Sequence, residues 1–168
     1  MAPRKGGDSF LGNVIIDFDL TEQIENIDCL FIDYKGRCMN SYKVNGTAVT
    51  DMSLYKNQRL QIPEDLVKKG GSNVVEIVFQ SEYVTDCEGV HYFKDTDGEE
   101  YIYTDLEPAN GHLWFPCFDQ PDLKAPYRLL VLTHEDWKII ATCTQKGPNH
   151  PAFTEEAIKD FGLDAQTV

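Results

Sequence analysis

The sequence predicts an all-β protein, an antiparallel β-sandwich that carries one short helix near its C-terminus. Three observations lead to this fold class. Short apolar runs recur along the chain with turn residues between them at regular spacing. Aromatic residues, which suit strands, make up 11% of the chain. Helical periodicity is almost absent, which favours a fold built from antiparallel sheets.

The individual strands follow from alternation and turn signals. In the first run, Ile16, Phe18 and Leu20 point to one face, while Asp17 and Asp19 point to the other. Asn-Gly at positions 45 and 46 is a strong two-residue hairpin signal after the third run. The predicted strands are 13–20, 27–34, 38–44, 58–62, 73–83 and 101–103, with 128–133 and 137–144 as a final pair.

Two segments have helical character. Residues 63–71 begin with proline and acidic residues, continue with lysines and end in Gly-Gly, an order that predicts one helical turn with a glycine stop. Residues 154–161 predict a short helix that Thr154 caps and Gly162 ends. The breaker cluster 147–151 precedes that helix. We therefore divide the chain into an N-terminal tail (1–8), a β-domain (9–144) and a linker with a helical tail (145–168).

The chain is strongly acidic. Its 168 residues suffice for one domain with a core, and its formal net charge is −13. Such a surface repels phosphate backbones, which excludes nucleic acid as a favoured partner. Solubility is the first explanation of this charge. An acidic surface would also attract cationic groups, such as the amino terminus of a peptide. No apolar run has the length of a membrane span, and no signal peptide is recognised at the start.

Five cysteines predict free thiols. Their number is odd and no pair has Cys-x-x-Cys spacing, which argues against a disulfide framework and a structural zinc site. Buried thiols that pack as small apolar groups are the expected state. Free thiols favour a reducing intracellular compartment. The cytoplasm is preferred, and an organelle is the alternative.

The segment from Tyr101 to Ala125 contains most of the functional information. Two prolines within six residues stiffen the stretch 115–121, prevent a regular strand there and predict a packed, ordered loop. Earlier, Glu107 precedes a proline, which favours extended geometry and a carboxylate held at the end of a strand. From this pattern alone, a solvated glutamate in a turn is favoured over a cation ligand.

The same residues resemble the amino-terminal domain of aminopeptidase N-type zinc aminopeptidases. The family reads roughly Q-F-E-P-x-x-A-R-x-x-F-P-C-F-D-E/Q-P-x-x-K-A, and this chain reads Thr-Asp-Leu-Glu-Pro from 104 to 108 and Phe-Pro-Cys-Phe-Asp-Gln-Pro-Asp-Leu-Lys-Ala from 115 to 125. The resemblance covers about residues 9–144. It implies a large saddle-like antiparallel β-structure that packs on a thermolysin-like catalytic domain. The residues that form its structural motif are Phe115, Pro116, Cys117, Phe118, Asp119, Pro121 and Lys124.

The resemblance also implies a binding role for two carboxylates. Glu107 matches the family glutamate that binds the free amino group of a peptide, by a charge-assisted pair with the ammonium. Asp105 stands where the family has a glutamine that shapes the pocket for the first side chain, and on a strand it would share a face with Glu107. A cis Glu107–Pro108 bond is consistent with relatives, whereas ordinary X-Pro preferences favour trans. Gly111-His112 replaces the family's Ala-Arg, so a local salt bridge is in doubt.

Residues for catalysis are missing from this sequence. The zinc motif H-E-x-x-H is absent: His134-Glu135 continues Asp-Trp-Lys. The substrate-binding motif G-x-M-E-N is absent too, so we assign no catalytic and no metal residue and expect zinc only in a partner catalytic domain. The other histidines, His91, His112 and His150, are expected to be surface or satisfied residues. Cys117 is expected to be a packed thiol, not a nucleophile.

Two functions remain open. In the first, the chain is the recognition domain of a zinc aminopeptidase and works with a catalytic domain. In the second, it is a non-catalytic structural or adaptor subunit of a larger assembly, an alternative that the family-unlike sequence after Thr144 favours. An independent enzyme is disfavoured. Both functions require a protein partner.

Overall fold

The computed structural model describes residues 7–23, 30–134, 136–142 and 144. Residues 8–126 form one compact unit, and the described residues from 127 onward belong to a second unit. The first unit contains every strand that the structure describes.

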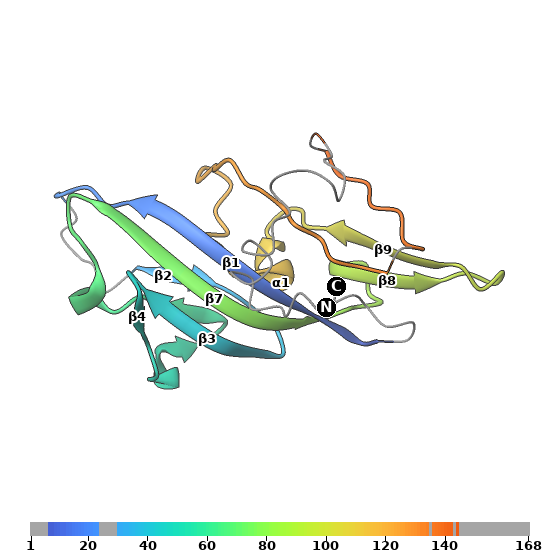
Figure 1. Ribbon diagram of the computed structural model, residues 1–168, viewed down its shortest axis with the longest axis horizontal. Helices are drawn as coiled ribbons and strands as arrows, with labels where there is room; N and C mark the ends of the chain where they lie inside the picture. The colour runs from blue at the N-terminus through green and yellow to red at the C-terminus, as the bar shows by residue number, and fades with distance from the viewer. Residues whose placement is uncertain (1–6, 24–29, 135, 143, 145–168) are drawn as a thin grey trace. The chain divides into compact units, whose positions relative to one another are not determined.

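The larger sheet has four antiparallel strands in the order β1-β7-β3-β4 (Figure 1). Strands β1 (Ser9–Asp19) and β7 (Ser72–Glu82) pair over their whole length, from Ser9 opposite Glu82 to Asp19 opposite Ser72. On the other side of β7 lies β3 (Cys38–Val44), which continues into β4 (Thr47–Ala48). The turn between them is the predicted Asn45–Gly46 hairpin, where both residues have positive φ angles of 50° and 80°.

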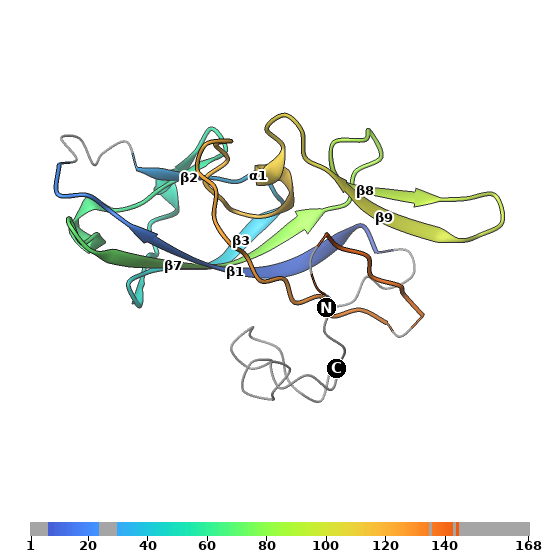
Figure 2. The ribbon, with the colours of Figure 1, turned by 90° about the horizontal axis from the view of Figure 1, so that it is seen from above.

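A three-stranded sheet, in the order β2-β6-β5, packs against the first. It consists of β2 (Phe31–Asp33), β6 (Arg59–Gln61) and β5 (Tyr55–Lys56). Figure 2 shows β2 on one side of the sheet that β1 and β7 form. The two sheets bury one core between them, as the two layers of a sandwich do. Its buried members are Ile32, Tyr34, Leu60 and Ile62 from the segments around the small sheet and Tyr42, Val44, Val75, Ile77 and Phe79 from the large one. The predicted all-β sandwich class is therefore confirmed.

A two-stranded hairpin follows the sandwich. It is formed by β8 (Gly89–Lys94) and β9 (Glu100–Asp105), which the chain joins through a turn at Gly98 with φ of +93°. At its base, β8 meets the short helix α1 (Gly111–Trp114), and Gly89 has φ of +73°. A Cβ on Gly89 would lie 2.7 Å from the Leu113 Cβ, so this contact requires glycine.

Most predicted elements are confirmed. The ranges 13–20, 38–44, 58–62, 73–83 and 101–103 correspond to β1, β3, β6, β7 and β9. The helical turn predicted at 63–71 is the 3₁₀ helix η3 (Glu64–Leu66), which follows Pro63, and a second one, η2 (Met52–Leu54), lies before β5. Of the range 27–34, the structure describes residues 30–34 and assigns only Phe31–Asp33 to a strand.

The last predicted strand pair, 128–133 with 137–144, is wrong. The described residues after Leu123 contain no strand, and the backbone hydrogen bond described there closes a turn, from Trp137 N to His134 O at 3.0 Å. An apolar run shows that a segment can extend, but a strand also needs a neighbour with which to pair. The predicted helix 154–161 lies outside the described residues. None of the helices that the structure describes is long and apolar enough to cross a bilayer.

Candidate substrate-recognition site

The two predicted binding carboxylates lie where β9 ends. Asp105 is the last residue of β9 and pairs with Gly89, and Glu107 lies two residues further in a turn whose Glu107–Pro108 bond is cis. Glu107 thus lies just past the end of the strand, so the face that the two residues would share on a strand does not apply to it. The turn is closed by the Asn110 N–H, which donates to Leu106 O at 2.9 Å.

Both carboxylates are open to a ligand. The side chains of Asp105 and Glu107 are exposed. In the part of the chain that the structure describes, neither carboxylate accepts a hydrogen bond or forms an ion pair. A carboxylate in this state keeps its full capacity for an ammonium group that approaches from solution.

The proline-rich loop after α1 packs as predicted. Pro116 is fully buried, and Phe115 and Phe118 pack against the core of the sandwich. The Phe118 ring meets the Phe18 ring edge to face, with 5.3 Å between centroids. Of the motif residues matched by sequence, Pro121 and Lys124 lie on the surface instead.

The loop is fixed to the small sheet through its backbone. Cys117 N donates to Asp33 O at 3.1 Å, and Asp33 N donates to Cys117 O at 2.9 Å. This pair extends β2 by one bridge, so it satisfies backbone groups that the prolines leave without a ladder. Two backbone hydrogen bonds therefore join the loop to β2 directly after α1.

His112 and Asp119 form a hydrogen-bonded pair at the position where the sequence left a local salt bridge in doubt. Asp119 Oδ2 lies 2.7 Å from His112 Nδ1 and accepts from His112 N at 3.1 Å. Both side chains are largely buried, with exposed fractions of 20% and 18%. Asp119 also lies close to Gly111: a Cβ at Gly111 would be 2.9 Å from Asp119 Oδ1 and 3.4 Å from Cys117 Sγ. His112 thus occupies the position of the family arginine and keeps a bond to the loop.

Cys117 is a packed thiol, as expected. Burial raises its pKa to about 12, and the neighbouring carboxylates of Asp119 and Asp33 add to this effect. Because the thiolate is the reactive form, this environment does not suit a nucleophile. The thiols of Cys38, Cys87 and Cys117 are all free, but Cys38 and Cys87 are exposed, so the expectation of buried thiols is wrong for these two.

The described histidines do not form a zinc site. His91 is buried, accepts from Cys87 N at 3.1 Å and stacks on Tyr103, so it is satisfied within the protein. His134 is exposed beside Asp136, with 3.1 Å between Nδ1 and Oδ2. Over the described ranges, no three histidine, cysteine or acidic residues come together as metal ligands. The described residues therefore do not fit a zinc centre.

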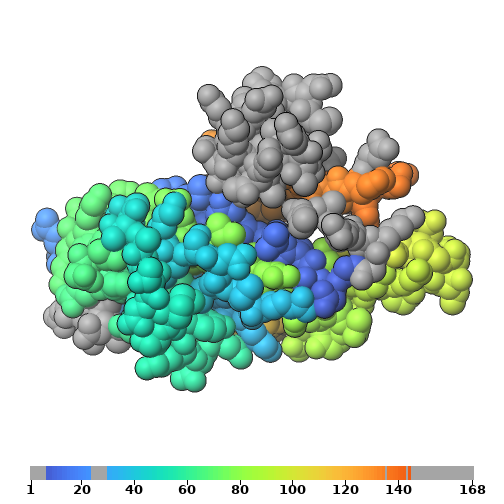
Figure 3. Space-filling model, turned by 60° about the horizontal axis from the view of Figure 1, so that its bottom comes forward, coloured from blue at the N-terminus to red at the C-terminus, as the bar shows by residue number. Residues whose placement is uncertain are grey.

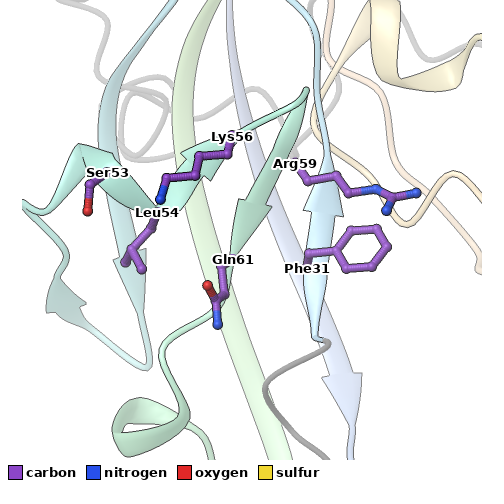
Figure 4. A pocket seen from close by; sticks show the side chains of 6 residues that line it. All are labelled: Phe31, Ser53, Leu54, Lys56, Arg59 and Gln61. Atoms are coloured by element: carbon purple, nitrogen blue, oxygen red, sulfur yellow. The ribbon is translucent and has the colours of Figure 1, made fainter.

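An open hollow lies on the outer side of the small sheet (Figure 4). The picture shows Lys56 and Arg59 pointing away from one another, with Arg59 beside Phe31. The guanidinium stacks 4.2 Å from the Phe31 centroid, and its Nε donates to Asp33 Oδ1 at 3.3 Å. The hollow contains neither Asp105 nor Glu107, and its cations do not converge on one point.

Comparison with known proteins decides the family. A sequence profile of the peptidase M1 N-terminal domain matches residues 3–161. The chain belongs to this family. Aminopeptidase N of Streptomyces lividans is 30% identical over 119 residues, which cover 70% of this chain and 14% of that protein. The probable M1 family aminopeptidase 1 of Encephalitozoon cuniculi is 25% identical over 136 residues, 81% of this chain and 15% of the relative.

The fold comparison agrees with the sequence comparison. The structure of native yeast LTA4 hydrolase superposes with a TM-score of 0.54 at 19% identity, over 70% of this chain and 19% of that one. This likeness shows the fold of the M1 N-terminal domain. The chain thus corresponds to a small part of the length of these relatives.

Sequence reasoning missed two contributors to the site. Strand β8 was not predicted as a strand, because Gly-Val-His-Tyr-Phe-Lys lacks clear alternation. The role of His112 was not predicted either, because its partner Asp119 lies seven positions away across a loop.

Proposed function

We propose that this M1 N-terminal domain recognises the free amino terminus of a peptide and that a zinc peptidase domain working with it performs hydrolysis. Glu107 anchors the ammonium group, and Asp105 lines the pocket for the first side chain. The observation that carries this proposal is the open carboxylate of Glu107 in the family's Glu-Pro position, directly after β9. A charge-assisted pair at this point would select peptides whose amino terminus is free.

The turn that presents Glu107 is well supported. On one side it continues β9, whose ladder to β8 ends at Asp105. On the other side it leads through Asn110 into α1, which the His112–Asp119 pair holds to the packed loop. A carboxylate on such a support loses little freedom when it binds an ammonium group, which favours affinity.

The partner and the compartment are also proposals. A protein partner, the zinc-bearing domain, is required because the described residues of this chain do not fit a zinc centre. The three unpaired thiols support a reducing, cytoplasmic environment. Free-thiol titration of the protein isolated under alkylating conditions checks the second point, and a disulfide between described cysteines would contradict it.

The first test is the aminopeptidase activity of the native assembly that contains this chain. Glu107→Gln removes the charge and keeps the shape, so kcat/KM should fall by roughly 10- to 100-fold, the value of a charge-assisted hydrogen bond. Glu22→Gln, at an exposed position after β1, is the matched control and should leave kcat/KM unchanged. Equal activity of the Glu107 variant and the wild type would refute the anchoring role.

The same assay examines Asp105. Asp105→Asn should change kcat/KM most between substrates that differ only in their first side chain, and a uniform change across substrates would remove Asp105 from that pocket. If the native assembly has no peptidase activity at all, the alternative function applies, in which the domain is a structural or adaptor subunit.

A further inference from the structure

The sequence contains two Asn-Gly pairs, Asn45–Gly46 and Asn110–Gly111. Such a pair can lose ammonia without an enzyme, because glycine has no side chain that shields its backbone nitrogen and its backbone rotates freely. The glycine nitrogen attacks the asparagine Cγ and a succinimide ring closes. The Nδ2 group leaves as ammonia, with the proton of the glycine N–H. Water then opens the ring and gives aspartate or isoaspartate.

The fold fixes the amide of Asn45. Its Nδ2 donates to Leu66 O at 2.8 Å and to Asn73 Oδ1 at 2.9 Å, and its Oδ1 accepts from Val74 N at 2.9 Å. Asn73 is itself fully buried and bonded to the backbone of Lys68. Attack by the next backbone nitrogen requires that the Asn45 amide turns and breaks all three of its bonds.

These hydrogen bonds protect Asn45 in a turn that water can reach. Figure 3 shows β3 and β4, in cyan, on the face that is turned to the viewer. Gly46 and Thr47 are exposed, and a Cβ on Gly46 would meet nothing within 4 Å. The fixed amide, and not burial of the turn, therefore slows the reaction at this pair.

The amide of Asn110 is held much less firmly. Among the described residues its side chain makes one hydrogen bond, from Nδ2 to Glu107 O at 3.4 Å, which is longer than the usual range of about 2.7–3.2 Å. The backbone N–H of Asn110 closes the turn to Leu106 O, so the side chain is not needed for that contact. The neighbouring Pro108 and Ala109 are exposed.

The packing also requires glycine after Asn110. A Cβ on Gly111 would lie 2.9 Å from Asp119 Oδ1 and 3.4 Å from Cys117 Sγ. The Asp119 carboxylate is bonded to His112 and cannot move away without losing that contact. The residue type that makes Asn110 reactive is thus the one that this position accommodates.

We propose that Asn110 is the deamidation site of the folded protein and that its hydrogen bonds protect Asn45. The product at Asn110 carries a new carboxylate three residues after Glu107. In its isoaspartate form it also adds one methylene to the backbone, between the turn and α1. Because His112 is bonded to Asp119, the turn must accommodate this longer backbone.

The test follows both asparagines in the intact chain at pH 8 and 37 °C by peptide mass mapping. In the native protein, Asn110 should convert roughly 10- to 100-fold faster than Asn45, the effect of one to two hydrogen bonds that must break. In urea-denatured protein the two rates should become similar, since the bonds of Asn45 are then lost. Equal rates in the native protein, or the same difference in urea, would overturn the proposal.

A pair of variants assigns the ammonia that the native protein releases. Asn110→Gln should abolish most of the release, because a glutamine must close a larger ring and reacts far more slowly. Asn40→Gln, at an exposed position in β3, is the control and should keep most of it. Equal release from both variants would place the reaction elsewhere and overturn the proposal.

A consequence for activity rests on the proposed function, whereas the deamidation itself does not. During incubation, kcat/KM of the native assembly should fall in proportion to the fraction of Asn110 converted, because the turn that presents Glu107 is altered. An Asn110→Gln assembly incubated in parallel should keep its own starting value. If Glu107→Gln lowers kcat/KM but conversion of Asn110 does not, the recognition function stands and the consequence for activity is wrong.

Discussion

At the scale of single residues, burial decides which polar groups are available for chemistry. The thiol of Cys117 lies in the conspicuous Phe-Pro-Cys-Phe motif and could be taken for a nucleophile, yet it is largely buried next to two carboxylates. Glu107, a residue that composition alone would class as a solvated side chain, is the open carboxylate at the end of β9. The functional candidate is thus the exposed carboxylate, and the thiol contributes to packing.

Cys117 should therefore resist alkylation. At pH 8 a thiol whose pKa is raised to about 12 holds almost no thiolate, so iodoacetamide should modify the exposed Cys38 and Cys87 first. Peptide mass mapping with and without denaturant measures this order. Modification of Cys117 in the native protein as fast as that of Cys38 would show that its surroundings are open.

At the scale of elements, a short helix and a loop hold the recognition turn. Helix α1 has four residues, too few to be stable by itself, so its contacts with the loop maintain it. Asp119 makes two of these contacts, one to the backbone and one to the ring of His112. The two residues are in contact in the fold although seven positions separate them in the sequence.

Asp119→Ala should lower the free energy of unfolding by about 1–3 kcal/mol, because it leaves the His112 N–H and ring without their acceptor. Urea denaturation measures the change. Asp122→Ala, at an exposed position in the same loop, is the control and should stay within about 0.5 kcal/mol. Asp119→Asn keeps an acceptor for the backbone N–H and should lose less than the alanine variant. A loss no larger than that of the control would show that the pair does not stabilise α1.

At the scale of the whole molecule, the core contains ionisable groups that must stay neutral. Tyr34 is 1% exposed and donates to Gln80 O at 2.8 Å, and burial raises its pKa to about 12. Burial raises the pKa of Tyr83 to about 12 as well. Tyr34, Tyr83 and Cys117 therefore keep their protons in the folded protein at a pH where the unfolded chain has lost them.

The stability of the protein should fall in alkaline solution. Below about pH 7.5 all three groups are protonated in both states, so their contribution is complete. As pH rises to about 12, the unfolded state releases protons that the folded state retains, first from the Cys117 thiol above about pH 8 and then from the two tyrosines above about pH 9. Each group then costs up to about 1.4 kcal/mol per pH unit. Urea denaturation at pH 8 and pH 10.5 measures the loss.

Tyr34→Phe tests this explanation, because it should reduce the slope of stability against pH between pH 10 and 12. Tyr127→Phe changes an exposed ring and should leave that slope unchanged. Equal slopes in the wild type and the Tyr34 variant would assign the alkaline loss to other groups.

The sequence alone determined the fold class, most strands and the family. Alternation in β1 and β7 and the Asn45–Gly46 turn depend on neighbours along the chain, so local patterns suffice to find them. The stretch 115–121 identified the family resemblance because its prolines and aromatics are unusual in combination. Each of these features depends on residues that are close together in the sequence.

The tertiary structure decided what depends on distant partners. It ended β9 before Glu107, joined His112 to Asp119, and bound Cys117 to Asp33 in β2. It also left the predicted strands 128–133 and 137–144 without strand pairing in their described residues. The physical reason is the same in each case: pairing and burial are set by groups far apart in sequence, and an apolar pattern cannot show whether such a partner is present.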